Sequence, residues 1–445
     1  MPPRIAAFLT IIFILFLFRR ESRKNGKVSG ALWLPVMWMA ITGTRFVGQW
    51  LSLSNFNDDG IGTEGSTIDA LYFLTLIITG IYVLNQRQIL LSKIVKENRW
   101  LSYFFIYCFI SIAWSDFPFI AFKRYIKILG HPIMALIIIT DPNPQDALRI
   151  VMKRCAFLMM PLSVLFIKYY PEYGRYFDQW TGQAYNSGVT LNKNELGYGC
   201  MLFGIFFFWN FLAAFRIENW RKKVDEILLS LLFLFMIGWL WYMAQSATSL
   251  ATFLIGVATI FILSLRIINK KFIGTYFIVT IIFAVLADSS FNIYEKIVEL
   301  LGRDPTLTDR TEVWEDALAL VSNPVLGMGF ESFWLGQRLT ILWSKWWWQP
   351  NQSHNGYIET YLNLGAVGVF LLFGILISTF RKISKQLIVE FNFSRLRLGF
   401  LFAIIFYNYT EAAFKAVHLV WTVFHIIAID YSKPITSKSK KPSSR

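Results

Sequence analysis

Apolar residues in this chain gather into long runs, and shorter polar or charged segments separate these runs. Most runs approach the ~17 to 25 residues that an α-helix needs to cross a bilayer. We therefore expect an all-α polytopic membrane protein with about 12 to 13 transmembrane helices. The runs lie at residues 5–18, 31–53, 68–84, 100–114, 126–140, 154–168, 197–215, 227–244, 249–265, 272–287, 357–380, 398–411 and 413–429.

Composition supports the same class. Hydrophobic residues make up 55% of the 445 residues and charged residues only 16%, and the mean hydropathy is +0.48. This leaves too little polar surface for a soluble protein of that length. The first run is followed by Phe18-Arg19-Arg20 and not by a small-residue cleavage site, so we expect a retained helix. The three cysteines lie in apolar runs, which favours neither a disulfide framework nor a metal site.

The net charge of +15 is distributed unevenly. Lys and Arg cluster in alternate connections and in the tail, which predicts that these parts are cytoplasmic. Membrane orientation explains the basic excess, so no nucleic-acid partner is needed. We expect one integral membrane domain over residues 1–430 and a basic cytoplasmic tail over 431–445.

The opposite side then holds a long polar loop at residues 288–355. It contains five Lys or Arg against nine Asp or Glu, so its arginines need an explanation other than orientation. Irregular extramembrane stretches usually carry the chemistry of a membrane protein. We expect this loop to be extracytoplasmic and to contain the active site.

Arg310 is the first candidate in the loop. Asp309 and Glu312 form a capping box, which places Arg310 in the first turn of a helix and turns it toward the apolar face with Trp314. A cation there opposes the helix dipole. Two interpretations remain open: a receptor for phosphate or diphosphate, which a guanidinium beside free amides would suit, and an ion pair with Asp304 or Glu331.

Other basic residues lie on the same predicted side. Arg303 is either a second half of a clamp or a solvated loop residue. Arg124 and Lys127 share one helical face at the membrane surface, as a functional patch or as snorkelling side chains. Arg45 lies inside an apolar span, so it must face a partner or a wet cavity, and the sequence does not identify that partner.

Aromatic residues are frequent in the segment 169–196 and around Trp346. Aromatic rings among amides and carboxylates suit sugar rings, but Tyr and Trp also collect at membrane interfaces. Both interpretations stay open, and interface anchoring is the weightier for Trp343, Trp346, Trp347 and Trp348.

His354 is the only one of the four histidines that we place in an extracytoplasmic segment. A histidine side chain titrates near neutrality, so His354 is a candidate base, oriented by Asn355, Glu359 or Gln352; the alternative is a capping or merely hydrogen-bonded role. His418 and His425 share a helical face, but a haem site is disfavoured because no partner pair exists. Glu411 and Lys415 are expected to pair with each other.

Several short motifs together resemble a known family, the bacterial O-antigen ligases and polysaccharide polymerases (Wzy-like). Their order and spacing carry the resemblance, and the early motifs are similar to the exopolysaccharide-polymerase branch of the ExoQ kind. The motifs are Ala31-Leu32-Trp33-Leu34-Pro35, Arg45, Trp50-Leu51, Trp114-Ser115-Asp116-x-Pro118, Asn192-Lys193-Asn194-x-x-Gly197, Arg310-Thr311-x-x-Trp314, Pro324-x-x-Gly327-x-Gly329, His354-Asn355-x-Tyr357 and Gly365-x-x-Gly368. Asp309 departs from the glycine usual in that family, which puts the anion affinity of Arg310 in doubt.

The resemblance implies a GT-C-type, metal-independent glycosyltransferase without a cofactor, in the bacterial inner membrane. It would polymerise undecaprenyl-diphosphate-linked oligosaccharides, with membrane lipid and a chain-length co-polymerase as partners. The catalytic candidates are His354, for the acceptor hydroxyl, and Arg310. The substrate-binding candidates are Arg124, Lys127, Lys193, Asn194, Arg303, Arg45, Asn355, Glu359, Trp314 and Tyr357. Two alternatives remain: a ligase for finished glycans, and a glycan transporter or flippase.

Overall fold

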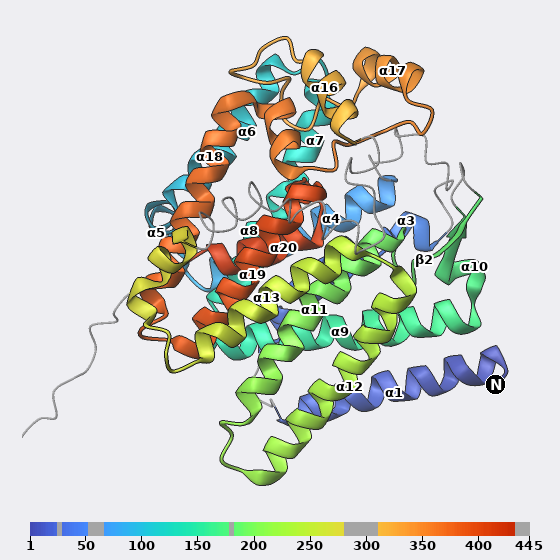
Figure 1. The fold of residues 1–445 in the computed structure, drawn as a ribbon, viewed down its shortest axis with the longest axis vertical. Coiled ribbons are helices and arrows are strands. Elements are labelled where there is room, and N and C mark those ends of the chain that lie inside the picture. Colours follow the sequence, from blue (N-terminus) through green and yellow to red (C-terminus); the bar gives the residue numbers. More distant parts are fainter. Residues whose placement is uncertain (25–28, 52–65, 178–181, 280–309, 432–445) are drawn as a thin grey trace, which may run out of the picture.

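The computed structural model describes residues 1–24, 29–51, 66–177, 182–279 and 310–431, and these consist almost entirely of helices (Figure 1). The prediction of an all-α polytopic membrane protein is confirmed. Within the described ranges, six helices are long and apolar enough to cross a membrane. They are α4 (Thr67–Gln86), α9 (Pro144–Tyr169), α11 (Lys193–Ala214), α12 (Trp220–Ala244), α13 (Ala247–Ser264) and α18 (Gly356–Gln386).

The remaining elements are shorter or more charged. The helices are α1 (Pro3–Lys24), α2 (Trp33–Thr42), α3 (Val47–Trp50), α5 (Leu91–Glu97), α6 (Arg99–Ile110), α7 (Pro118–Ile128), α8 (Gly130–Ile139), α10 (Pro171–Gly174), α16 (Arg310–Ala319), α17 (Gly336–Lys345), α19 (Phe391–Thr410) and α20 (Leu419–Ala428). Short 3₁₀ turns cover Gly30–Leu32, Ser111–Trp114 and Lys270–Phe272. Two strands, β1 (Arg175–Phe177) and β2 (Ala184–Asn186), pair antiparallel.

Most of the predicted apolar runs overlap these helices, with three differences. The run 413–429 is helical only as α20, from Leu419 to Ala428. The run 31–53 is divided into α2 and α3, because the chain leaves the helix at Gly43, a residue type common at helix C-termini. This break puts Arg45 outside both helices. The run 126–140 is divided between α7 and α8. The run 272–287, the first part of the loop and the tail from 432 extend outside the described residues.

Local chemistry fixes where several helices begin. Proline occupies the first turn of α7 and α9, where its missing N–H costs nothing. Asparagine side chains cap α11, α12 and α18. At α11, Asn192 accepts a hydrogen bond of 3.0 Å from the Glu195 N–H, and this cap fixes the position of Lys193 and Asn194.

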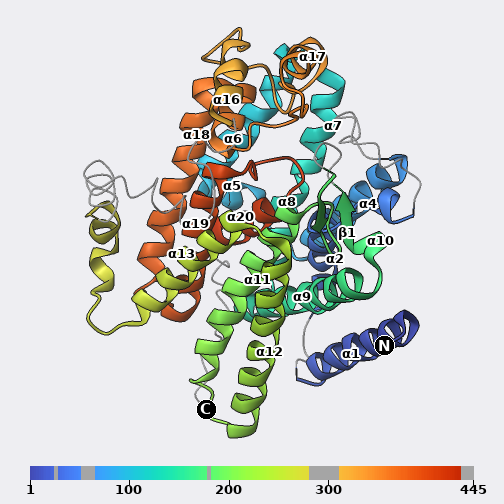
Figure 2. The same ribbon diagram turned by 45° about the vertical axis from the view of Figure 1, so that its right-hand side comes forward.

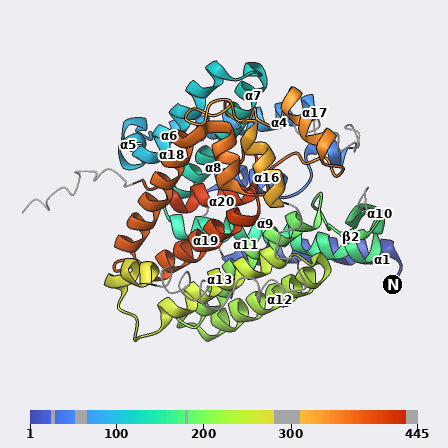
Figure 3. The same cartoon turned by 45° about the horizontal axis from the view of Figure 1, so that its top comes forward.

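The long helices pack into a bundle. α11 packs against α12 and α13, α13 against α19, α18 against α6 and α19, and α20 against α8. Figures 2 and 3 show this arrangement from two further directions. Large apolar side chains such as Phe235 and Ile78 are exposed on the outer faces, as expected for helices that contact lipid.

The described part of the long loop folds around an apolar core of its own. Figures 1 and 2 show α16 and α17 together at one end of the molecule, near α7. The residues of this core are Val313, Ala317, Met328, Phe333, Trp334, Leu339, Leu342 and Leu362. Trp343, Trp346 and Trp348 pack against it, whereas Trp347 is 62% exposed. Three of the four tryptophans expected at a membrane interface therefore stabilise the loop itself.

Two glycine motifs join this loop to α18. Gly365 interrupts α18 with φ 61° and ψ −163°, and Gly327 also has a positive φ of 72°. A Cβ on Gly365 would lie 2.3 Å from the Val325 carbonyl oxygen, so only glycine fits. The Ala366 N–H donates to Pro324 O over 2.9 Å, and backbone packing thus anchors the loop at this point.

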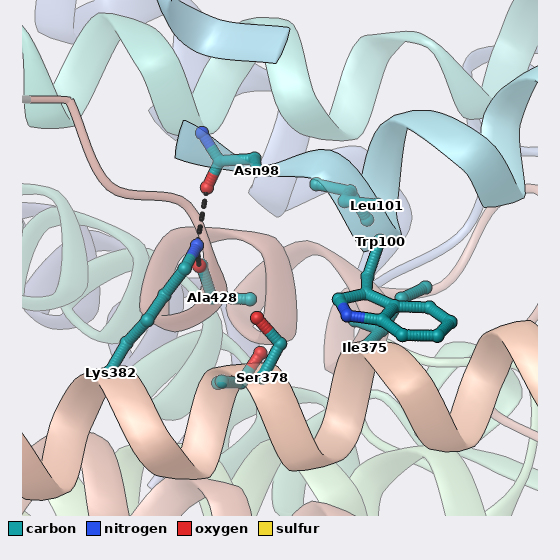
Figure 4. Close-up of a pocket in the computed structure, with 8 residues that line it drawn as sticks. Asn98, Trp100, Leu101, Ile375, Ser378, Lys382 and Ala428 are labelled. Atoms are coloured by element: carbon teal, nitrogen blue, oxygen red, sulfur yellow. Dashed lines mark hydrogen bonds between the residues drawn. The ribbon is translucent and has the colours of Figure 1, made fainter. Parts of the chain in front are cut away.

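The end of the bundle away from the loop is closely packed. A small cavity of about 10 Å³ lies between α6, α18 and α20, and Figure 4 shows the residues that line it. Its charged residue, Lys382, donates to Asn98 Oδ1 over 2.7 Å. A space of this size holds about one water molecule. It is therefore too small to be a substrate site.

Candidate active site

A buried carboxylate, Glu411, lies in the connection between α19 and α20. Its Oε2 is 3.2 Å from His354 Nδ1, and its Oε1 is 3.6 Å from Arg310 Nη2. Asn194 Nδ2 donates to the same Oε1 over 3.1 Å. Three predicted site residues from distant parts of the sequence therefore meet at one side chain.

Arg310 reaches Glu411 from the first turn of α16. Its Nη1 donates to Thr410 O, and the side chain is 19% exposed. The structure thus provides an ion pair, as one of the two interpretations expected, but with Glu411 and not with Glu331; Asp304 lies outside the described residues. The guanidinium keeps part of its surface accessible, so the pair is compatible with contact to an anionic ligand.

His354 lies just before α18 in a conformation that non-glycine residues rarely adopt. Its φ is 52°, and such local strain often occurs at functional positions. Burial alone would raise the pKa of the Glu411 carboxyl, but the hydrogen bond from His354 and the charges of Arg310 and Lys415 hold this pKa below its ordinary value. Glu411 is therefore a carboxylate at neutral pH.

This ionisation state determines the tautomer of His354. A carboxylate only accepts hydrogen bonds, so the Nδ1 of His354 carries the proton that is shared with Glu411 Oε2. The lone pair of a neutral imidazole is then on Nε2. The arrangement suits a general base that faces away from Glu411.

Trp314 and Glu359 hold the residue that precedes His354. Trp314 Nε1 donates to Ser353 O over 2.6 Å. The Ser353 N–H and hydroxyl each donate to Glu359 Oε2 over 3.0 Å, and Trp334 Nε1 donates to the same oxygen. Glu359 is buried, with only 7% of its surface exposed. The hydrogen bonds of Trp314 and Glu359 to Ser353 therefore fix the backbone next to His354.

Asn355 and Tyr357 have roles in packing at the start of α18. Asn355 Oδ1 accepts hydrogen bonds from the N–H groups of Tyr357 and Ile358 and so caps the helix. The Tyr357 hydroxyl donates to Ile405 O over 2.9 Å. Their assignment to substrate binding stays a prediction.

The connection that contains Glu411 also makes two hydrogen bonds to the loop. Lys415 Nζ donates to Gln352 Oε1, and the Ala416 N–H donates to Glu331 Oε1 over 2.9 Å. Lys415 therefore bonds to Gln352, and Glu411 bonds to His354, Arg310 and Asn194, so the expected pairing of Glu411 with Lys415 is replaced by these contacts. Lys415 still acts on Glu411 through its charge.

Arg124 approaches the site from α7. Its Nη1 donates to the backbone oxygen of Glu331. Burial raises the pKa of the Glu331 carboxyl, the charge of Glu359 raises it further, and Arg124 and Lys415 oppose this shift. Lys127 follows one turn later and is 8% exposed, whereas Arg124 is half-buried. Whether the two form a functional patch or snorkel stays open.

Two cations lie near the start of α11. Lys193 Nζ is 3.6 Å from the ring centroid of Tyr185, beside the Asn194 that contacts Glu411. Arg45 Nη2 donates to Tyr173 O over 2.5 Å. Arg45 also interacts electrostatically with Glu195, which answers in part the question of its partner. Arg303 and Asp309 lie outside the described residues.

Sequence reasoning missed the central role of Glu411. The available signal was an acidic residue between two apolar runs on the side of the loop, and this signal alone does not identify which residues it meets. Across the described ranges, no group of three or more His, Cys, Asp or Glu side chains is placed to hold a metal ion.

Comparison with known proteins agrees with the motifs. The O-antigen ligase family matches residues 231–373, a range that includes Arg310 and His354. The chain is also 27% identical over 310 residues to the exopolysaccharide production protein ExoQ of Rhizobium meliloti (strain 1021). That match covers 65% of this chain and 66% of the relative, just under two thirds of its length. The predicted resemblance to this family and its exopolysaccharide branch is confirmed.

Proposed function

We propose that this O-antigen-ligase-like membrane protein is a glycosyltransferase that polymerises undecaprenyl-diphosphate-linked oligosaccharide repeats during exopolysaccharide or O-antigen synthesis. One observation supports the proposal above the others: Glu411 contacts both His354, at 3.2 Å, and Arg310, at 3.6 Å. Such a transfer needs a base for the acceptor hydroxyl and a cation for the departing diphosphate. The two side chains supply these two needs at one place.

The proposed reaction is a single displacement. His354 Nε2 takes the proton of the acceptor hydroxyl while the acceptor oxygen forms a bond to the anomeric carbon of the donor glycan. The bond from that carbon to the diphosphate oxygen breaks, and its electron pair leaves with the lipid diphosphate. An in-line displacement inverts the anomeric carbon, and Glu411 stabilises the imidazolium that forms.

Positive side chains receive the charge of the leaving group. Arg310 is the main candidate. Lys193, which precedes the Asn194 that contacts Glu411, and Arg124, which donates to Glu331 O, are further candidates. Guanidinium groups bind phosphate oxygens bidentately. These groups supply the counter-charge, so the proposed transfer is metal-independent and needs no cofactor.

The setting follows from the same proposal. The protein would be a GT-C-like, multi-pass protein of the bacterial inner membrane, with the loop 288–355 periplasmic and the C-terminus cytoplasmic. Its substrates would be lipid-linked oligosaccharides in contact with membrane lipid. A chain-length co-polymerase is a further proposed partner.

Ligation of a finished glycan to a lipid or protein is the second candidate, because the family match over residues 231–373 carries the description of an O-antigen ligase. The match to an exopolysaccharide production protein favours polymerisation. Both reactions need the same base and the same cation, so the site geometry is equally compatible with each.

Reconstitution separates the two reactions. The purified protein is placed in liposomes with lipid-linked repeats extracted from cells of its own source that lack its gene. We expect a ladder of products spaced by one repeat on a gel. A single transfer that occurs only after a lipid or protein acceptor is added would favour ligation, and no consumption of the donor under either condition would refute the proposed glycosyl transfer.

A further inference from the structure

The contact between His354 and Glu411 joins two helices. His354 lies two residues before the first residue of α18, and Glu411 directly follows the last residue of α19. These two helices pack against each other (Figure 1). The 3.2 Å between His354 Nδ1 and Glu411 Oε2 therefore depends on how the start of α18 lies on the end of α19.

Asn408, in the last turn of α19, lies at this junction and is fully buried. Its Oδ1 accepts a hydrogen bond of 2.9 Å from the Ala413 N–H, and its Nδ2 donates to Ile404 O over 2.9 Å. Ala413 comes two residues after Glu411, where the chain is no longer helical. The Asn408 side chain therefore ties the chain that follows Glu411 back to α19.

The same Asn408 oxygen also contacts the start of α18. A Cβ on Gly356 would lie 2.2 Å from Asn408 Oδ1 and 3.0 Å from its Cγ. Gly356 has no positive φ, so its backbone conformation would accept alanine. Moving Asn408 aside would break its two hydrogen bonds, to Ala413 and to Ile404. The side chain of Asn408 is thus the reason that glycine is needed at the start of α18.

Two backbone oxygens of α19 complete the junction. The Tyr357 hydroxyl, at the second residue of α18, donates to Ile405 O over 2.9 Å. The Glu411 N–H donates to Tyr407 O over 3.0 Å. The segment that follows His354 and the backbone of Glu411 are therefore both placed against the last two turns of α19.

We propose that Asn408 is a positioning residue for the His354–Glu411 pair: its Oδ1 sets the spacing between the start of α18 and the connection after α19, and so keeps the imidazole in contact with the carboxylate. A displacement of about 1 Å in a reacting group can cost on the order of 10²-fold in rate. The consequence for turnover rests on the proposed function, whereas the consequence for the His354–Glu411 contact does not.

The tautomer of His354 reports this spacing without turnover. The full-length protein, isotopically labelled in its four histidines, is studied in liposomes by solid-state NMR above about pH 8, where an imidazole is ordinarily neutral. The His354 signal is the one that His354→Ala removes. We expect the proton on Nδ1 in the wild type. Asn408→Ala should move most of the signal to the Nε2–H tautomer, which an imidazole side chain prefers when no acceptor holds Nδ1–H.

Asn210→Leu is the matched control for the loss of a buried asparagine. Asn210 is 4% exposed and donates to Glu226 Oε2 and Ser230 Oγ within the other end of the bundle. This substitution should lower the melting temperature and leave the His354 tautomer unchanged. An equal tautomer change in Asn210→Leu and Asn408→Ala would mean general loosening and would overturn the proposal.

Gly356→Ala tests the same contact from α18 and keeps the test informative where Asn408→Ala fails to fold. Alanine is ordinarily favourable in a helix, so a change of tautomer here would come from the clash with Asn408. Gly199→Ala is the control, because a Cβ on this buried glycine of α11 would meet only Met160 Cε, at 3.9 Å. Gly356→Ala/Asn408→Ala should be no more affected than the more affected single variant, because substitutions that remove one shared contact do not add.

Turnover gives the second measurement. Initial rates in proteoliposomes should fall on the order of 10- to 100-fold in Asn408→Ala and in Gly356→Ala. An unchanged tautomer in these two variants, or fully additive effects in the double variant, would overturn the proposal. A tautomer change in a protein whose wild type transfers no glycan would refute the proposed function and leave the positioning role in place. Glycan transfer with no tautomer change would do the reverse.

Discussion

Among single residues, Glu411 has the contacts that set the protonation of His354 and the position of Arg310. Its carboxylate fixes the proton of His354 on Nδ1 and holds the guanidinium of Arg310. It also accepts a hydrogen bond from Asn194. A buried carboxylate that satisfies three donors is well suited to keep a candidate base and a candidate anion receptor at a fixed distance.

Arg310→Lys should preserve the fold and lose most activity, because an ammonium group cannot make the bidentate contact of a guanidinium. We expect a loss of about 2 kcal/mol, or roughly thirtyfold in rate. Initial rates of polymer formation in proteoliposomes measure this. The control is Arg149→Lys, because Arg149 forms a partly exposed ion pair with Asp146. Wild-type activity of Arg310→Lys would show that Arg310 has no part in the reaction.

Glu411→Gln should alter how thermal stability depends on pH. The folded-state pKa of Glu411 is lowered, so its stabilising effect is fully present above the unfolded-state pKa of about 4.3 and is lost as the pH falls through the folded value. We expect the wild type to be more stable than the variant by on the order of 1 to 3 kcal/mol near pH 7. This gap, followed by thermal melts in detergent, should begin to narrow only below the unfolded-state pKa of about 4.3 and close as the pH falls through the lower folded-state pKa; a gap independent of pH would contradict the assigned charge.

At the level of elements, the loop is held in place by backbone contact with α18. Gly327 and Gly365 approach so closely that neither accommodates a Cβ. Tyr107 Oη lies 3.2 Å from Leu326 O and 3.1 Å from Leu364 O, and its one hydroxyl hydrogen is shared between these two carbonyl oxygens. The loop position, and with it the position of His354, therefore depends on these glycines.

Gly365→Ala should detach the loop from α18. The combination of φ 61° and ψ −163° at Gly365 is almost restricted to glycine and costs another residue about 1 to 3 kcal/mol, and the clash with Val325 O adds to this. We expect a lower melting temperature and faster proteolysis within residues 310–355. Gly238→Ala in α12 is the matched control, because a Cβ there meets nothing within 4 Å; equal effects of the two substitutions would refute this account.

The sequence predicted the elements well and their mutual contacts poorly. Apolar length located the helices, and the asparagine and proline signals located several of their starts. The motifs also selected Arg310 and His354. The partner of both, Glu411, lies 57 residues from His354 in the chain, and no local pattern records which connection between helices faces which loop. The sequence also did not predict that the Glu359 side chain points to Ser353, because this contact depends on how the chain folds around Ser353.

At the level of the whole molecule, charge is arranged differently at the two ends of the bundle. Away from the loop, ion pairs join α1, α9 and α12. The pairs are Arg20 with Asp225 at 2.9 Å, Lys153 with Glu226 at 2.7 Å and Arg154 with Glu21 at 3.1 Å. The Glu411 cluster occupies the loop end. The loop end also contains structural ion pairs, such as Arg338 with Asp116 at 2.6 Å, but the cluster of Glu411, His354 and Arg310 lies only there among the described residues.

Reporter fusions test the orientation that follows. By the positive-inside rule the loop should be extracytoplasmic and the C-terminus cytoplasmic. Alkaline phosphatase fused after residue 330 should be active, and the same enzyme fused at the C-terminus should be inactive. The opposite pattern would overturn both the topology and the site that is built on it.

The central claim is that His354 removes the acceptor proton while other groups bind the donor. The most direct measurement compares donor binding and turnover in the same proteoliposomes for the wild type and His354→Ala, with radiolabelled lipid-linked repeats. We predict that the variant retains bound donor and loses about 10² to 10⁴ in rate. Near-normal turnover by His354→Ala would contradict the claim and make Glu331 the next candidate for the base.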